Sequence, residues 1–445
     1  MLMSAPLCAL NALEVGEPLF GTAPHEKAWL FLEHTGPWGA RALEESDLPE
    51  VVKGRLLRLR RETGARVSFI RRAQDTPPPW RLMLWRADPQ GGRCARWALP
   101  DLEALLHLPL EDWLRGTRPL PAEALCSNPL YLVCVNARRD ACCGRFGPLL
   151  YRALQRLRPD AVWMSTHIGG HRFAPNLMVL SHGLAYGRVR SAEDAAAIVQ
   201  ATEQSQVHLG LLGGRLALPR PAQAAEHFLR QRTGARAVDA FRLAWLRESP
   251  EHHWEAAFLG PEEQAYRVTL RREKSPLQRP TSCGAPAKPM RFYRLQAIET
   301  HPVRRYRAAG GVIVGPEGKV LVLLRPSRRE VRLPKGHIEP GEEPWVAARR
   351  EIAEEAGLSP EDMHPLADLG VKPVGFLYEG ALVWRHEHYF LVQWQSGSLI
   401  PGETQFLPLW LPWAQAEAAL TYPAEKAWLR RAREAYQRLQ EEPQG

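Results

Sequence analysis

Three glutamates in one short segment have the spacing of a metal site. Glu351, Glu354 and Glu355 stand at positions i, i+3 and i+4, so on a helix their carboxylates share one face. Three neighbouring carboxylates repel one another unless a cation lies between them. Ligand sets made only of oxygen favour Mg²⁺ or Mn²⁺. Taken by itself, the spacing is also that of an acidic, solvated helix face.

The residues around these glutamates predict a loop followed by a helix. A glycine turn spans residues 336–341, and a helix is expected over 344–356, ended by Gly357 in a C-cap position. Arg350 and Glu342 lie eight residues apart. We expect them to form an ion pair that holds the loop against the helix.

The complete pattern resembles a Nudix box. It reads Gly336, five residues, Glu342, seven residues, Arg350-Glu351-Ile352, one residue, Glu354-Glu355, one residue, Gly357-Leu358. The resemblance implies an α/β/α sandwich that hydrolyses nucleoside-diphosphate-linked compounds. It also implies that Glu354 and Glu355 hold the catalytic metal and that Glu351 is a third ligand or the base. Glu339, in the preceding loop, is the alternative base.

Residues beside the box suggest how a substrate would be held. Lys335 and His337 flank Gly336 and are expected to reach phosphate oxygens. The segment LPKGH resembles Nudix members that cleave dinucleoside polyphosphates or diphosphoinositol polyphosphates. Glu387, on an alternating strand, is a candidate further ligand or base; ordinary surface alternation is the other interpretation.

A second set of residues lies in the first half of the chain. Cys134, Cys143, His167 and His171 offer two thiolates and two imidazoles, and Cys142 is an alternative to Cys143. Such a set suits tetrahedral Zn²⁺ or an iron–sulfur cluster with mixed ligands. Two glycines between the histidines place them on a tight loop after a strand. The spacing does not decide between the two metals.

Longer segments resemble the sucrase/ferredoxin-like family of thioredoxin-fold proteins. They are GEPLFGTAPHEKAWLFLEHTGPWG, VCVNARRDACCGRFG, STHIGGHRFAPN, AYGRV and TSCG, spread over residues 15–300. The resemblance implies a 2Fe–2S cluster and a redox partner protein. The ligands that it implies are Cys134, Cys143, His167 and His171.

The expected elements give three parts. A βαββα order, typical of a thioredoxin-like unit, recurs within residues 1–205 and predicts two related half-units. The parts are a thioredoxin-like domain at 1–275 with a small α+β appendage at about 210–275, a Pro-rich linker at 276–303, and an α/β/α Nudix domain at 304–445. The last helix should turn Trp428, Leu429, Ala432 and Tyr436 inward.

Composition limits the classes of protein that fit. The formal net charge is +9, with +10 in residues 1–300 and −1 in residues 301–445, but scattered arginines favour a solvated surface over nucleic-acid binding. No apolar run reaches the ~18 residues of a membrane span, and no export signal is recognisable. Seven cysteines, an odd number, then favour reduced thiols or a metal site in the cytoplasm. Cys8, Cys94 and Cys126 are expected to be unpaired, and Cys283 has no predicted role.

The sequence thus predicts a Mg²⁺- or Mn²⁺-dependent pyrophosphohydrolase joined to a 2Fe–2S domain. Its substrate class is a nucleotide-type small molecule, with dinucleoside polyphosphates favoured. The alternative is a redox or electron-transfer protein whose Nudix module senses a nucleotide.

Overall fold

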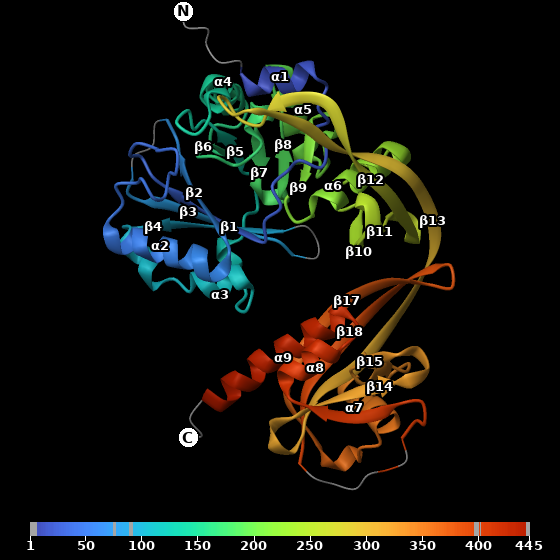
Figure 1. The fold of residues 1–445 in the computed structure, drawn as a ribbon. Coiled ribbons are helices and arrows are strands. Elements are labelled where there is room, and N and C mark those ends of the chain that lie inside the picture. Colours follow the sequence, from blue (N-terminus) through green and yellow to red (C-terminus); the bar gives the residue numbers. More distant parts are fainter. Residues whose placement is uncertain (1–6, 74–76, 89–91, 396–399, 401, 442–445) are drawn as a thin grey trace, which may run out of the picture. The chain divides into compact units, whose positions relative to one another are not determined.

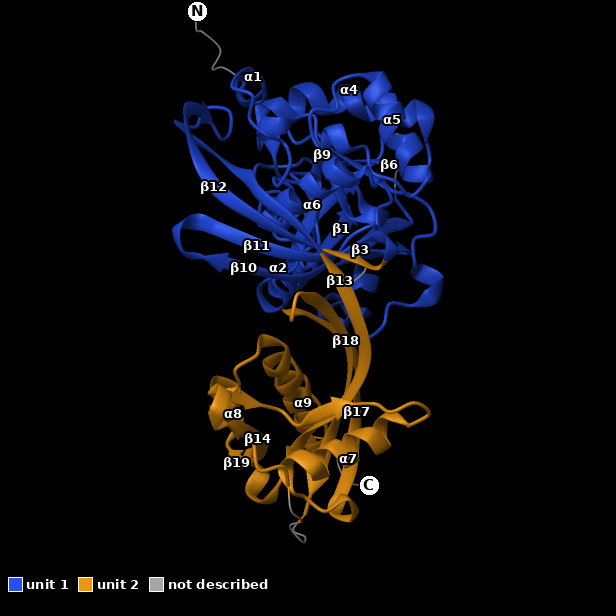
Figure 2. Cartoon of the chain, turned by 90° about the vertical axis from the view of Figure 1, so that its right-hand side faces the viewer, with its two compact units in different colours: residues 1–262, 266–300 blue, residues 263–265, 301–445 orange. Residues whose placement is uncertain are grey.

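The computed structural model describes residues 7–73, 77–88, 92–395, 400 and 402–441. The chain divides into two units, coloured in Figure 2. Unit 1 comprises residues 1–262 and 266–300, and unit 2 comprises residues 263–265 and 301–445. In the described part of the chain, no helix is both long and apolar enough to cross a membrane.

Unit 1 is built on a nine-stranded sheet in the order β4-β3-β1-β2-β6-β5-β7-β8-β9 (Figure 1). Its strands are β1 Ala28–Glu33, β2 Arg66–Arg71, β3 Trp80–Arg86, β4 Arg93–Leu99, β5 Tyr131–Cys134, β6 Val162–Ser165, β7 Leu177–Val179, β8 Leu184–Tyr186 and β9 Leu212–Arg215. Its helices are α1 Cys8–Glu14, α2 Glu50–Thr63, α3 Leu110–Arg115, α4 Ala141–Leu157, α5 Ala192–Glu203 and α6 Arg220–Thr233.

The sheet contains the same arrangement twice. Strands β1 and β2 are parallel, with α2 between them in the chain. Strand β3 then pairs antiparallel with β1, and β4 pairs antiparallel with β3. Strands β5 and β6 are likewise parallel, with α4 between them. Strand β7 then pairs antiparallel with β5, and β8 pairs antiparallel with β7. Ile70 of β2 pairs with Ser165 of β6 and joins the halves. The predicted duplicated thioredoxin-like α/β fold is confirmed.

Local sequence explains how α4 places its cysteines. All four residues of β5 are buried, as expected for a central strand of a covered sheet. Asp140 is the N-cap of α4, and its Oδ1 accepts a hydrogen bond from the Cys142 N–H at 2.9 Å. Cys134 therefore ends a buried strand, and Cys142 and Cys143 occupy the first turn of the next helix.

The segment predicted as a linker is extended. Strands β10 Arg242–Ser249, β11 His253–Leu259, β12 Gln264–Pro280 and β13 Ala287–Val314 follow α6. Within the predicted linker, Tyr293, Leu295 and Ile298 pack against the core beneath α6. The prolines there do not prevent strands, since the φ angle of proline suits extended backbone. The domain boundaries stay a prediction.

Unit 2 has a mixed sheet that continues from β13. Residues 303–314 of β13 pair in parallel with β18, and β17 pairs antiparallel with β18. The other strands and helices are β14 Val320–Arg325, β15 Glu330–Arg332, β16 Lys335–His337, β17 Met363–Tyr378, β18 Ala381–Trp394, β19 Leu407–Leu411, α7 Pro344–Ala356, α8 Trp413–Ala419 and α9 Pro423–Glu441.

Helices cover both faces of this sheet. Ile313 faces α7 and packs in one core with Ile352, whereas its neighbour Val312 packs in a second core with Trp428 of α9. The alternation follows from the two-residue period of a strand. The predicted α/β/α sandwich is confirmed, and Trp428 lies on the inward face of the last helix as expected.

Candidate functional site

The glutamate helix is held by a rigid loop. Helix α7 begins at Pro344 in the N1 position and ends at Gly357, whose φ of 70° is the left-handed conformation of a helix C-cap. Arg350 Nε and Nη2 donate to the two carboxylate oxygens of Glu342, both at 3.0 Å. Arg350 Nη2 also donates to the His337 carbonyl at 2.9 Å. The expected ion pair is present, and it ties the turn to the helix.

Arg350 also contacts two of the three predicted metal ligands. Its Nη1 lies 2.8 Å from Glu351 Oε1 and 3.2 Å from Glu354 Oε2. These acidic partners, Glu342 foremost, raise the pKa of the guanidinium above its usual range. Glu351 and Glu354 are therefore brought to one side of α7 by the same cation.

Glu351 and Glu355 are half-buried carboxylates. Burial raises the pKa of Glu351, against the opposing effect of Arg350. Burial also raises the pKa of Glu355 to about 7, although Lys335 acts in the opposite direction. Glu355 Oε2 accepts a hydrogen bond from the Lys335 backbone N–H at 2.8 Å. A bound cation would restore the ionised form that burial disfavours, so these residues fit a hard divalent ion.

Lys335 and His337, the two residues predicted to contact phosphate, differ in their exposure to solvent. Lys335 was expected to reach phosphate, but its side chain is 2% exposed and its Nζ lies 2.8 Å from Glu425 Oε1. This buried ion pair with α9 occupies the ammonium, which corrects the expectation. His337 is exposed and its ring stacks on Tyr306, with ring centroids 4.2 Å apart. Its imidazole remains open to a ligand.

Glu387 does not lie with the α7 glutamates. Its side chain is fully buried, and its carboxylate accepts hydrogen bonds from Arg385 and, at 2.9 Å, from Trp428 Nε1. Tyr389, two residues along β18, packs in the core on the α9 side, so strand alternation turns Glu387 to that side as well. The sequence showed the alternation but not which face met α7. Its proposed metal role is not supported.

Glu339 lies in the exposed turn before α7. Its backbone N–H donates to Glu342 Oε2 at 2.9 Å, and its carbonyl accepts from the Glu342 N–H at 3.0 Å. The turn therefore fixes Glu339 just before the N-terminus of α7, where the residue is exposed to solvent.

In the first half of the chain, two thiols and an imidazole lie close together. The ligand atoms of Cys134, Cys143 and His167 lie within 4.8 Å of one another. His171 is outside that group among the described residues, with its ring centroid 5.0 Å from that of His167. Both histidines have a buried Nδ1 that makes no hydrogen bond within the described part of the chain. Unpaired buried nitrogens beside thiols fit a metal centre.

The two thiols of this group influence each other. Interaction with Cys143, and next with His167, holds the pKa of Cys134 well below its usual value. Interaction with Cys134, together with burial, raises the pKa of Cys143. One thiolate in a buried site is the protonation state that a metal ligand needs.

Cys142 is separated from this group although it adjoins Cys143. Its Sγ lies 3.6 Å from Cys8 Sγ and 3.4 Å from Cys283 Sγ. Successive helical residues point about 100° apart, which explains the separation. Sequence reasoning did not place Cys8 and Cys283 beside Cys142; the signal for Cys283 was its TSCG segment.

The structure also corrects the expectation that Cys94 and Cys126 are unpaired. They form a disulfide, with Cα atoms 5.4 Å apart. The Cys126 N–H donates to the Cys94 carbonyl at 2.9 Å. The two residues are brought together because the chain returns along β4 after α3, which spacing alone does not reveal.

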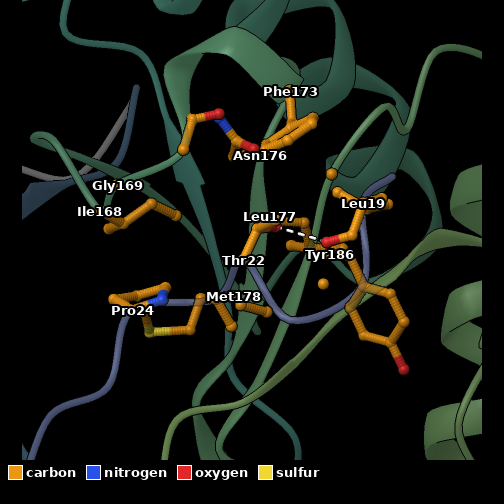
Figure 3. Close-up of a pocket in the computed structure, with 15 residues that line it drawn as sticks. Leu19, Thr22, Pro24, Ile168, Gly169, Phe173, Asn176, Leu177, Met178 and Tyr186 are labelled. Carbon is orange, nitrogen blue, oxygen red and sulfur yellow. Dashed lines mark hydrogen bonds between the residues drawn. The ribbon is translucent and has the colours of Figure 1, made fainter. Parts of the chain in front are cut away.

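A small pocket adjoins the histidine loop (Figure 3). Ile168 and Gly169 of that loop line it, together with Pro24, Phe173 and Met178. Its volume of about 20 Å³ has room for a water molecule but not for a nucleotide. This pocket is therefore too small to be a nucleotide-binding site.

Comparisons with known proteins agree with both parts of the chain. The sucrase/ferredoxin-like family model matches residues 19–212, and the NUDIX domain model matches residues 304–432. Mutator protein MutT4 of Mycobacterium tuberculosis is 31% identical over 170 residues, which cover 36% of this chain and 67% of that protein.

Two further similarities are weaker. Altered inheritance of mitochondria protein 32 of Meyerozyma guilliermondii is 27% identical over 124 residues, and the match covers 24% of this chain and 44% of that protein. The crystal structure of C. elegans Ap4A hydrolase has 25% identity and a TM-score of 0.25, and covers 30% of this chain and 99% of that chain. On the family match and the MutT4 relative, this chain belongs to the Nudix family as a Nudix hydrolase, with a sucrase/ferredoxin-like domain in the same chain.

Proposed function

We propose that unit 2 is a Mg²⁺- or Mn²⁺-dependent pyrophosphohydrolase of a nucleotide-type small molecule, with dinucleoside polyphosphates as the favoured class. The observation that carries this proposal is the pair Glu351 and Glu355. They are half-buried carboxylates on one side of α7 whose pKa values burial raises. Such a pair favours a bound hard cation.

The residues would divide the work as follows. Glu351, Glu354 and Glu355 would hold the ion, and Arg350 keeps the first two on the same side of the helix. A bound Mg²⁺ or Mn²⁺ would neutralise negative charge on the diphosphate, and it would lower the pKa of a water molecule bound to the ion. Glu351 or Glu339 would accept the proton of the attacking water. Gly336 leaves room for the Glu351 carboxylate.

The substrate class rests on the segment before the helix. LPKGH resembles members that cleave dinucleoside or diphosphoinositol polyphosphates, and the exposed His337 ring is available for a phosphate oxygen. Lys335 is no longer part of this proposal, because Glu425 occupies its ammonium.

We propose that Cys134, Cys143, His167 and His171 hold a 2Fe–2S cluster. The gathered thiols and the two unpaired Nδ1 atoms support this ligand set. A bound cluster would carry single electrons to a redox partner protein. Five of the seven cysteines are outside disulfides, which favours the predicted cytoplasmic location, whereas the Cys94–Cys126 disulfide argues against it.

The decisive experiment uses the full chain, purified without oxygen. Wild type, Glu355→Gln and the matched control Glu361→Gln are assayed with Mg²⁺ against diadenosine polyphosphates, ADP-ribose, NADH, nucleoside triphosphates and diphosphoinositol polyphosphates. Glu361 is exposed and lies beyond the box, so its variant should behave as wild type. We expect Glu355→Gln to lose at least ~100-fold in kcat on one substrate class, as loss of a metal ligand requires.

The other outcomes are equally clear. Turnover that survives in a folded Glu355→Gln protein contradicts the metal assignment. Tight nucleotide binding without hydrolysis in wild type favours the sensor alternative. A visible absorbance spectrum of the same preparation reports on the cluster independently, and a colourless, iron-free protein after anaerobic reconstitution contradicts it.

A further inference from the structure

Unit 1 contains a second buried group of metal-binding side chains, which we call the second thiol cluster. It consists of Cys8, Asp140, Cys142 and Cys283, whose ligand atoms all lie within 4.8 Å of one another. Cys8 and Cys142 are fully buried, and Asp140 is 4% exposed. Neither the proposed hydrolase site nor the proposed 2Fe–2S site uses these residues.

The cluster joins three distant segments of unit 1. Cys8 is the first residue of α1, Cys142 lies in the first turn of α4, and Cys283 lies between β12 and β13. Figure 1 shows α1 and α4 at the same end of this unit. In sequence, Cys8 and Cys283 are 275 residues apart. The three thiols therefore meet only through the tertiary structure of unit 1.

The distances match the edges of a tetrahedral metal site. The three Sγ···Sγ distances are 3.6 Å for Cys8–Cys142, 3.4 Å for Cys142–Cys283 and 3.7 Å for Cys283–Cys8. With zinc–sulfur bonds of about 2.3 Å, tetrahedral geometry places the sulfur ligands ~3.8 Å apart. Van der Waals contact alone gives similar values, so the carboxylate decides the argument.

Asp140 is oriented as a fourth ligand. Its Oδ1 and Oδ2 accept hydrogen bonds from the Cys142 and Cys283 backbone N–H groups, both at 2.9 Å. These bonds aim the carboxylate at the sulfurs, and Oδ1 lies 3.4 Å from Cys283 Sγ and 3.7 Å from Cys8 Sγ. Oδ2 also lies 4.0 Å from Nε2 of His171, a ligand of the proposed 2Fe–2S site. A cation bound between the Asp140 carboxylate and the three sulfurs would compensate the negative charge of all four ligands. Backbone hydrogen bonds that orient a ligating carboxylate are typical of metal sites.

We propose that Cys8, Cys142, Cys283 and Asp140 bind one Zn²⁺ ion. Three thiolates and one carboxylate complete a closed tetrahedral shell, which is the arrangement of a structural site. The ion ties α1 and the β12–β13 turn to the N-terminus of α4. In α4, Cys143 follows Cys142 and belongs to the proposed 2Fe–2S site. Zinc bound to Cys142 would therefore also stabilise the helix that carries a cluster ligand.

The test measures zinc and iron in the full chain by mass spectrometry, after anaerobic purification and incubation with ZnCl₂ followed by desalting. We expect about one zinc per chain, and at least ~90% loss of zinc in Cys8→Ser and in Cys283→Ser with iron retained, since each removes one of four ligands. Cys134→Ser is the control, and it should lose iron and retain zinc. Zinc that survives Cys283→Ser, or zinc lost only in Cys134→Ser, overturns the proposal.

A second measurement needs no variant. X-ray absorption at the zinc edge of the wild-type protein should give about three sulfur neighbours at ~2.3 Å and one oxygen at ~2.0 Å. A shell of two sulfurs and two nitrogens places zinc in the Cys134 group and contradicts the assignment. Wild-type protein that binds no zinc, with Cys142 and Cys283 in a disulfide by peptide mapping, also contradicts it.

Discussion

The carboxylate of Glu351 occupies the place where a side chain of residue 336 would begin. A Cβ added to Gly336 would lie 1.7 Å from Glu351 Oε2 and 2.3 Å from Oε1. The backbone of Gly336 has no left-handed φ, so the glycine is required for space. The first residue of the box thus determines where a glutamate of α7 can lie.

Gly336→Ala should therefore reduce hydrolysis without unfolding unit 2. The new methyl group must push the Glu351 carboxylate aside, and misplacing one metal ligand costs ~10–100-fold in activity. The measurement is kcat together with the Mn²⁺ concentration at half-maximal rate, which should rise. Wild-type values for both, in a protein with an unchanged circular dichroism spectrum, would show that the Glu351 position is unimportant.

Glu355→Gln should stabilise the protein in EDTA at high pH while it abolishes activity. Burial raises the pKa of Glu355 from 4.5 to about 7, so the folded protein keeps a proton that the unfolded chain releases. Stability conferred by the wild-type residue therefore falls as pH rises from 4.5 to 7. Glutamine is neutral throughout and escapes this loss.

In EDTA, Glu355→Gln should raise the free energy of unfolding by about 1 kcal/mol at pH 8, once the pKa shift is discounted for solvent screening. At pH 5 the increase should be close to zero. Thermal unfolding at both pH values measures it, and hydrogen exchange of α7 locates it. Saturating Mg²⁺ should reverse the order at pH 8, because only the wild type keeps all the ligands. Equal stabilisation at pH 5 and pH 8 contradicts the mechanism.

Arg350→Lys should damage the loop although the charge is kept. Arg350 donates to both oxygens of Glu342 and to the His337 carbonyl, and a lysine ammonium cannot reproduce this planar fork. We expect about a tenfold fall in kcat/KM and faster proteolysis of the loop before α7. Arg349→Lys, at the adjacent position, is the matched control. If both variants behave alike, the ion pair does not organise the loop.

Glu387→Gln should leave hydrolysis within about threefold of wild type, because Glu387 faces α9 and not α7. It should nevertheless lower the free energy of unfolding by about 1–3 kcal/mol, since it weakens a buried pair with Arg385. Activity assays and urea unfolding on one preparation separate the two effects. A loss as large as that of Glu355→Gln would restore Glu387 as a metal ligand.

Cys134→Ser should bleach the visible absorbance of the anaerobically reconstituted protein, whereas Cys142→Ser should keep it. Cys134 lies with Cys143 and His167, while Cys142 lies with Cys8 and Cys283. The measurement is the absorbance per chain alongside iron content. If Cys142→Ser loses the absorbance and Cys143→Ser keeps it, then Cys142 and not Cys143 is the cluster ligand.

Patterns that repeat within a few residues could be interpreted without the fold. The spacing of Glu351, Glu354 and Glu355 fixes a shared helix face whatever surrounds the helix. The βαββα order likewise revealed the duplicated half-units, because strand and helix periods are local properties. The ion pair between Arg350 and Glu342 could also be predicted, since only the first two turns of α7 and the residue before them separate the two.

Contacts between distant residues depended on the tertiary structure. Lys335 is paired with Glu425, 90 residues away, and Cys8 meets Cys283 across 275 residues. Sequence alternation showed that Glu387 lies on one face of a strand, but only sheet packing decided that this face meets α9. Local periods fix which residues share a face, whereas strand pairing and core packing decide what that face touches.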